Sequence, residues 1–190
     1  IRHSAGLGKS PTEKDPDVYD HRYIHCDVLV VGAGISGILA AKNAAKNNLK
    51  TLLVDEKNEL GGSTIYQNRE FNKIENQSSS DWLKKEIKEL KNIKNLEVKT
   101  RTSVAAFHGY NYLLARENLT DHLEKKDKQG KIRQRLLKIR AKKVILATGA
   151  LERPLSFNNN DRPGIMLSSS VKKYADFYVL VSAKVNVCLT

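Results

Sequence analysis

Three glycines at fixed spacing give this sequence its clearest chemical signal. Gly32, Gly34 and Gly37 form a G-x-G-x-x-G pattern directly after an apolar run at residues 27–31. In such a turn the first glycine allows a tight bend, the second lets a diphosphate approach the backbone, and the third lets a helix pack close to the strand. Free N–H groups at the start of that helix, together with its dipole, favour an anion. The pattern therefore predicts a site for the diphosphate of a dinucleotide.

Asp55 supplies a second group for the same ligand. It follows Gly34 at about the 20-residue spacing expected for a carboxylate that binds a ribose. It also ends a second apolar run, at residues 52–54. A hydrogen bond to a charged acceptor contributes roughly 1.5–3 kcal/mol. Because a carboxylate would repel a 2′-phosphate, the sequence favours NAD or FAD over NADP. The alternative is a tight strand-to-helix turn that binds nothing.

The elements that position these residues follow one another in the order of a βαβ unit. The runs at residues 27–31 and 52–54 are typical of buried parallel strands. Between them, residues 35–47 are predicted to be helical, with small residues on the packed face and Lys42 and Lys46 turned to water. The predicted fold class is α/β, with a Rossmann-like parallel sheet.

Beyond this unit the chain is expected to leave the parallel sheet and return to it. Residues 81–93 carry apolar side chains at helical spacing, and Trp82 is expected in the core rather than at an interface. Predicted strands at residues 96–104, 110–115 and 132–141 would form an antiparallel β-meander over about residues 96–141. The chain would re-enter the main sheet at residues 144–150, where an apolar strand runs into Ala147, Thr148 and Gly149.

The predicted domain organisation has four parts. Residues 1–25 are expected to be an extended, irregular lead-in. Residues 26–155 would form the dinucleotide-binding domain with its inserted meander, and residues 156–182 a connection with a helix near residues 171–178. Residues 183–190 alternate like a strand and would begin a second dinucleotide-type domain. Because the chain begins with Ile1 rather than methionine, we expect a fragment of a longer protein.

Charge and hydropathy narrow the class of partner. The formal net charge is +12, but the basic residues are spread along the chain without a zinc-finger, helix-turn-helix or aromatic RNA-binding motif. We therefore expect no nucleic acid, and solvated basic faces or docking of an acidic partner subunit instead. No apolar run approaches the roughly 18 residues needed to cross a bilayer, and the first residues lack the apolar core of a signal peptide. The expectation is a cytoplasmic protein with no membrane partner.

Other residue patterns predict no additional site. Gly8, Lys9 and Ser10 resemble the end of a P-loop, but its first glycine is missing. The histidines of the first 25 residues lack cysteine or acidic partners at ligand spacing, so no metal site is predicted. Cys26 and Cys188 do not form a C-x-x-C pair, which favours buried free thiols over a redox disulfide. No general acid, base or nucleophile is identifiable, and the catalytic residues stay unknown.

A glycine loop followed, behind a meander, by an Ala-Thr-Gly strand resembles flavoproteins with two dinucleotide-binding domains, such as thioredoxin and glutathione reductases. Three segments carry a closer resemblance: residues 15–31, residues 149–155 with Glu152-Arg153-Pro154, and residues 160–167. Over almost the whole chain they are similar to alpha subunits of heterotetrameric sarcosine oxidases. The last two segments also resemble large subunits of opine and related amino-acid dehydrogenases.

This resemblance implies an oxidoreductase that acts on the CH–NH group of sarcosine, forming glycine with oxygen and passing the one-carbon unit to tetrahydrofolate. It implies NAD in this subunit, FAD in the beta subunit, FMN at a subunit interface, and gamma and delta subunits as further partners. The fragment would lack the folate-binding region and be inactive alone. The implied cofactor contacts are Gly32, Gly34, Ser36, Gly37, Asp55, Glu56, Gly62, Thr148 and Gly149.

Two alternatives stay open. In one, the same glycine loop holds a redox-active FAD, as in an NAD(P)H-dependent oxidoreductase or the large subunit of an opine or amino-acid dehydrogenase. In the other, a bound dinucleotide only stabilises a non-catalytic scaffold whose basic surface docks a partner. The two glycines after Asp55, Gly61 and Gly62, fit a backbone that passes close to the cofactor, but they equally fit a plain turn.

Overall fold

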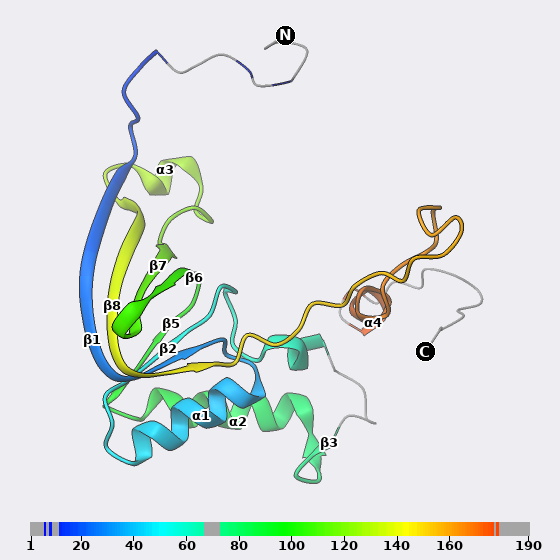
Figure 1. Cartoon of the computed structure of the whole chain (residues 1–190), viewed down its shortest axis with the longest axis horizontal. Helices are drawn as coiled ribbons and strands as arrows, with labels where there is room; N and C mark the ends of the chain where they lie inside the picture. The colour runs from blue at the N-terminus through cyan, green and yellow to red at the C-terminus, as the bar shows by residue number, and fades with distance from the viewer. Residues whose placement is uncertain (1–5, 7, 9–11, 67–72, 177, 179–190) are drawn as a thin grey trace.

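A computed structural model describes residues 6, 8, 12–66, 73–176 and 178 (Figure 1). Its main feature is a six-stranded sheet with the order β5-β2-β1-β8-β7-β6. The strands of this sheet are β1 (Val18–Val31), β2 (Thr51–Val54), β5 (Leu96–Lys99), β6 (Thr102–His108), β7 (Tyr112–Asn118) and β8 (Ile132–Leu146). The remaining elements are helices α1 (Ile35–Lys46), α2 (Ser79–Lys91), α3 (Lys125–Lys128) and α4 (Ser168–Asp176), the 3₁₀ turns η1 (Gly62–Tyr66) and η2 (Gly109–Asn111), and the short hairpin strands β3 (Lys73–Ile74) and β4 (Gln77–Ser78).

The parallel part of the sheet confirms the predicted α/β fold. Strands β5, β2, β1 and β8 pair in parallel, and α1 and α2 lie together against one face (Figure 1). Helix α1 begins at Ile35, as predicted, and its buried face includes Gly37, Ala41 and Ala45, which allow close packing. Trp82 of α2 is only 2% exposed and belongs to the core between helices and sheet, as predicted.

Lys42 departs from its predicted position in water. Its ammonium lies 2.7 Å from a carboxylate oxygen of Glu86 and 2.7 Å from one of Glu89, both on α2. The Lys42 side chain is 15% exposed and that of Glu86 7%. The prediction was wrong because the helical pattern of α1 alone does not show that a second, acidic helix lies beside it.

Two long strands, β1 and β8, extend over segments that the sequence predicted as separate parts. Residues 18–25, expected to be an irregular lead-in, form the first half of β1. The predicted separate strands at residues 132–141 and 144–150 are largely one strand, β8, which ends at Leu146. β1 and β8 pair from Val18↔Ile132 to Val31↔Leu146. Because each satisfies the backbone groups of the other, residues with many polar side chains still form strands.

Asp27 links the middle of β1 to the segments on both sides of it. The N–H groups of Asp27 and Val28 both donate to the carbonyl of Lys50, at 2.8 and 3.2 Å. The Asp27 carboxylate accepts from the Lys50 N–H at 2.8 Å and pairs with the Lys142 ammonium at 2.7 Å. In Figure 1 β1 and β8 bend together, from the layer with the meander to the layer backed by helices.

The meander is shorter than predicted. Strand β5 pairs in parallel with β2, so residues 96–99 belong to the parallel sheet. The antiparallel part begins at Thr102 and consists of β6, β7 and the first half of β8. The sequence prediction merged β5 and β6 because both alternate, whereas the Arg101 N–H bonds back to the Lys57 carbonyl and separates them. A second core cluster, which includes Leu52, Leu113 and Ile139, joins the two layers.

A buried chain of charges links the meander to the parallel sheet. Arg135 is 9% exposed and Glu117 8%. An Arg135 nitrogen lies 2.9 Å from the Asp20 carboxylate and another lies 3.4 Å from that of Glu117. The other Glu117 oxygen is 3.0 Å from the Lys99 ammonium. The chain therefore connects β1, β8, β7 and β5 through alternating charges.

The described part of the chain contains no helix that is long and apolar enough to cross a bilayer. The predicted start of a second domain at residues 183–190 lies outside the described residues.

Replacing Glu117 by alanine tests the buried chain of charges. The substitution leaves Arg135 with Asp20 and Lys99 with Glu97 as their remaining partners, and we expect the free energy of unfolding to fall by about 1.5–3 kcal/mol, the contribution of a hydrogen bond to a charged group. Glu97→Ala removes only a more exposed partner of Lys99, for which about 1 kcal/mol or less is expected. Urea unfolding of both variants measures the difference. Equal losses would show that the chain of charges does not stabilise the fold.

Candidate functional site

The carboxyl ends of three parallel strands meet at the predicted glycine loop. The Gly32 N–H donates to the Val54 carbonyl at 2.8 Å, and the Ala147 N–H donates to the Val31 carbonyl at 2.8 Å. These bonds hold the ends of β2 and β8 on either side of the end of β1. Ligands of open α/β sheets bind at this edge.

Gly32 and Gly37 are required by close backbone contacts. Gly32 has φ +98°, and a Cβ on it would lie 2.3 Å from the carbonyl oxygen of Ala147. A Cβ on Gly37 would lie 1.8 Å from the carbonyl oxygen of Gly32. The loop therefore closes only with glycine at both positions. The role of Ala147 as the neighbour of Gly32 was not predicted, because only the strand pairing reveals it.

Gly34 has a different environment. Its φ and ψ are −70° and −176°, which any residue adopts, and a Cβ there would meet no atom of the described residues within 4 Å. The space beside it is open, as expected of a position that a diphosphate approaches. The fold itself therefore does not require glycine at this position.

The first turn of α1 presents backbone N–H groups to that space. The Ile38 N–H bonds to the Gly34 carbonyl at 2.9 Å, and the amides before it have no partner within the helix, as at any helix start. No side chain caps the helix, and its first turn contains no acidic residue. Ser36 is exposed here. The arrangement suits an anion held by backbone groups.

Asp55 contacts the glycine loop directly. Its Oδ2 accepts from the Ala33 N–H at 2.6 Å and its Oδ1 from the Lys57 N–H at 2.8 Å. An ionised carboxylate has about four acceptor positions, so both oxygens can also accept from ribose hydroxyls. Asp55 is half-buried at the end of β2, and the neighbouring Glu56 is exposed.

The glycine pair after β2 lies against the loop. The Gly61 N–H donates to the Ala33 carbonyl at 2.7 Å. A Cβ on Gly62, at φ +58°, would lie 3.0 Å from the Cα of Gly34. The predicted residue Gly62 is thus beside Gly34. Gly61 was not predicted as a site residue, although a Cβ there would lie 2.4 Å from Leu83; the paired glycines were the available signal.

Thr148 and Gly149 follow Ala147 at the same edge of the sheet. Both are exposed, and Gly149 has φ +73° with open space around it, since a Cβ there would meet no atom within 4 Å. The fold thus brings the predicted residues of the glycine loop, the end of β2 and the end of β8 to one place.

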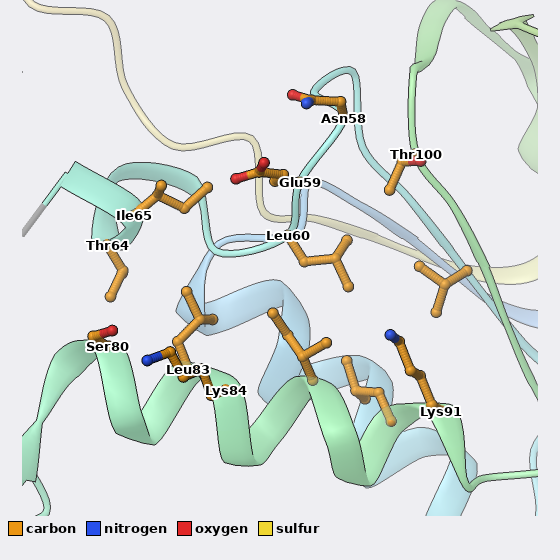
Figure 2. Close-up of a pocket in the computed structure, with 13 residues that line it drawn as sticks. Asn58, Glu59, Leu60, Thr64, Ile65, Ser80, Leu83, Lys84, Lys91 and Thr100 are labelled. Atoms are coloured by element: carbon orange, nitrogen blue, oxygen red, sulfur yellow. The ribbon is translucent and has the colours of Figure 1, made fainter. Parts of the chain in front are cut away.

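The cavity shown in Figure 2 lies beside this edge and is separate from it. It measures about 660 Å³, within the usual range for small-molecule sites. Loop residues such as Leu60 and Ile65 form one wall, and α2 residues such as Leu83 form the other, with Lys84 and Lys91 at the rim (Figure 2). None of the nine predicted cofactor contacts lines it. The predicted site is therefore the open surface at the strand ends.

Cys26 is unsuited to redox chemistry. The thiol is buried and free, and burial raises the pKa of Cys26 to about 11. Since the thiolate is the nucleophile, a protonated core thiol is inert. The predicted buried free thiol is confirmed for Cys26, while Cys188 lies outside the described residues. In the described part of the chain, no three His, Cys, Asp or Glu residues are grouped to hold a metal ion.

Glu152 ties the segment after β8 to α4. Its Oε1 accepts from the Ser168 N–H at 3.0 Å and the Ser168 hydroxyl at 2.6 Å, and its Oε2 accepts from the Ser169 N–H at 2.8 Å. Donation by the Ser168 hydroxyl, followed by Ser169, lowers the pKa of Glu152 to about 2. Helix α4 in turn contacts η1, because the Lys173 ammonium lies 4.6 Å from the ring centre of Tyr66. The segment with Glu152 therefore returns toward the turn that starts at Gly62.

Comparison with known proteins identifies the family to which this chain belongs. The model of the pyridine nucleotide-disulphide oxidoreductase family matches residues 26–187. The sarcosine oxidase subunit alpha of Corynebacterium sp. (strain U-96) is 41% identical over 187 residues, which is 98% of this chain and 19% of that protein. The sarcosine oxidase subunit alpha of Rhizobium meliloti (strain 1021) is 37% identical over 178 residues, 94% of this chain and 18% of that protein. The chain thus spans about a fifth of the length of these relatives.

Among solved structures, L-proline dehydrogenase from P. horikoshii is similar with a TM-score of 0.65 and 25% identity. The match covers 86% of this chain and 30% of that one. The resemblance to sarcosine oxidase alpha subunits is confirmed by the two curated relatives.

Gly37→Ala tests whether close contact holds the loop together. The added Cβ would overlap the Gly32 carbonyl, so we expect a loss of stability of roughly 1–3 kcal/mol, the usual cost of overpacking. Gly109→Ala is the matched control, because a Cβ there meets no atom within 4 Å. Thermal unfolding of both variants measures the effect. A Gly37→Ala protein as stable as the control would contradict the loop geometry.

Glu152→Gln tests the cap of α4. The pKa of Glu152 is below its ordinary value of 4.5, so its contribution to stability is complete above about pH 4.5 and disappears as the pH falls toward 2. At neutral pH we expect faster hydrogen exchange of α4 amides in Glu152→Gln than in the parent. The difference should shrink in acid, where the parent also loses the charge. Glu124→Gln, an exposed carboxylate on another segment, should leave exchange in α4 unchanged at every pH.

Proposed function

The chain belongs to the pyridine nucleotide-disulphide oxidoreductase family, and from this we propose that it binds the ADP half of NAD at the strand ends of β1, β2 and β8. The observation that carries the proposal is the environment of Gly34. Its neighbours Gly32 and Gly37 are fixed by backbone contacts, whereas the space beside Gly34 is open and is faced by the first turn of α1. A diphosphate fits such a space, because it needs donors and close approach but no side chain.

Each residue of the site has a role in this proposal. The amides after Gly34, including that of Ser36, donate to the diphosphate, and Gly62 lets the neighbouring loop approach it. Asp55 accepts from the ribose hydroxyls while its bond to the Ala33 N–H holds the loop in place. Glu56, Thr148 and Gly149 border the same edge. A bound dinucleotide supplies hydride-transfer chemistry, and it also stabilises the folded chain by ligand linkage.

The wider activity proposed for the protein follows its relatives. Two sarcosine oxidase alpha subunits match the chain over 94% or more of its length. We therefore place this segment in the alpha subunit of a complex that oxidises sarcosine to glycine with oxygen and tetrahydrofolate, together with beta, gamma and delta subunits. In that complex FAD belongs to the beta subunit and FMN to a subunit interface. This segment contributes nucleotide binding rather than a catalytic residue.

The likeness to L-proline dehydrogenase favours a second candidate function. In it, the same strand ends hold FAD in the large subunit of an amino-acid or opine dehydrogenase, or in an NAD(P)H-dependent oxidoreductase. The site geometry suits both candidates, since NAD and FAD share the ADP half that the glycine loop would bind. They differ in the nucleotide that the purified protein carries.

Gly34→Leu tests the proposed function. The side chain would fill the open space without backbone strain, so we expect the protein to fold normally and to lose bound nucleotide at least about tenfold, the equivalent of 1.4 kcal/mol. Nucleotide per folded molecule is measured by mass spectrometry after denaturation. Gly109→Leu, also in open space, should retain the nucleotide.

The nucleotide released from the parent protein separates the two candidates. Colourless protein that releases NAD supports the first, and yellow protein that releases FAD supports the second. Unchanged occupancy in Gly34→Leu, or no nucleotide in the parent protein at all, would show that the strand ends do not bind a dinucleotide.

A further inference from the structure

The meander turns one face away from the core, and its side chains are ordered in rows by the strand register. One row crosses four strands, because His25 pairs with Arg140, Arg140 with Tyr112, and Tyr112 with His108. A parallel row contains Tyr23 and Lys138, and a third contains His21, Leu136 and Arg116. We call the surface made by these three rows the outer meander face.

Cations and aromatic rings are stacked together on this face. The Arg140 guanidinium lies 5.2 Å from the ring centre of Tyr112, which lies 5.8 Å from that of His108. The Lys138 ammonium lies 4.8 Å from the ring centre of Tyr23, which is 6.3 Å from that of His21. Such contacts hold long side chains in place, so less rotamer freedom remains to be lost when a partner binds.

The three rows contain no carboxylate. Arg116, Lys138 and Arg140 give the face a positive charge. Acidic residues at its borders already have partners: Asp27 pairs with Lys142 at 2.7 Å, Asp121 with Arg133 at 2.7 Å and Asp20 with Arg135 at 2.9 Å. Glu97, which lines a hollow together with Tyr23 and His25, pairs with Lys99 at 3.2 Å. The face therefore carries an uncompensated positive charge, unlike the buried chain of charges behind it.

Large side chains on this face are exposed. Tyr23 is 66% exposed and Leu136 40%. Within the described part of the chain, the neighbouring edge of β1 has no strand paired to residues 19–25, because β2 pairs only with Val28–Val31. Exposed tyrosine and arginine are enriched in protein interfaces, and an unpaired edge strand is itself a place for association.

We propose that the outer meander face docks a partner subunit that presents carboxylates. The inference rests on the proposed function, since it supposes that this chain is part of a multisubunit complex, as the name of its relatives, subunit alpha, indicates. Charge complementarity selects an acidic partner. A protein fits better than a nucleic acid, because Leu136 lies between the cations and interrupts the continuous line of basic residues that a phosphate backbone follows.

The test uses the full-length protein co-expressed with its partner subunits. Carbodiimide joins a lysine to a carboxylate in direct contact, and we expect Lys138 to be coupled to an aspartate or glutamate of another subunit, as identified by mass spectrometry. Arg116→Glu reverses an exposed charge in the third row. We expect it to lower the share of the chain found in the complex at least tenfold at roughly 0.15 M salt.

Lys94→Glu is the matched control, with the same change of charge at an exposed position after α2, and it should assemble normally. Both variants should retain nucleotide, so a failure of docking is distinguishable from a failure of the proposed function. Coupling of Lys138 only within its own chain, or normal assembly of Arg116→Glu, would overturn the inference. So would binding of a single-stranded oligonucleotide that Arg116→Glu abolishes while assembly is unchanged.

Discussion

Close contact between backbones at the carboxyl ends of β1 and β8 is the constraint on which the rest of the structure depends. Gly32 lies against the carbonyl of Ala147, and Gly37 lies against that of Gly32. Because neither position has room for a side chain, α1 starts directly under the sheet with its first amides pointing past the strand ends. The bonds from Gly32 to Val54 and from Ala147 to Val31 then bring β2 and β8 to the same edge.

The two long strands extend this constraint to the other layer. β1 and β8 stay paired on both sides of Asp27, so the edge with the glycine loop and the meander are parts of the same two strands. Two core clusters fill the faces of the sheet. The chain from Asp20 through Arg135 and Glu117 to Lys99 joins the meander to the parallel strands with charges that satisfy one another.

The predictions from sequence were most accurate for elements whose structure is determined by residues close together in the chain. The glycine loop, α1 and β2 were predicted because their turn chemistry and apolar patterns are local. Residues 18–25 were missed as a strand because they are polar, and their pairing with β8 makes them one. Residues 132–141 were correctly predicted as a strand, but their continuation to Leu146 was not, since the sequence does not show that β1 pairs along the whole length. Lys42 was misplaced for the same reason, since Glu86 and Glu89 come from a different helix. In the candidate site, the glycines and Asp55 were predicted from their spacing, whereas the contact of Ala147 with Gly32 depends on strand pairing that no local pattern encodes.

Different constraints require glycine at the three positions of the loop. Positions 32 and 37 are restricted by the polypeptide itself, but position 34 has an ordinary backbone conformation and free space around it. Only a ligand would then keep selecting glycine there. A homologue with a larger residue at position 34, and glycine still at the other two positions, would therefore keep the fold but would no longer bind the nucleotide.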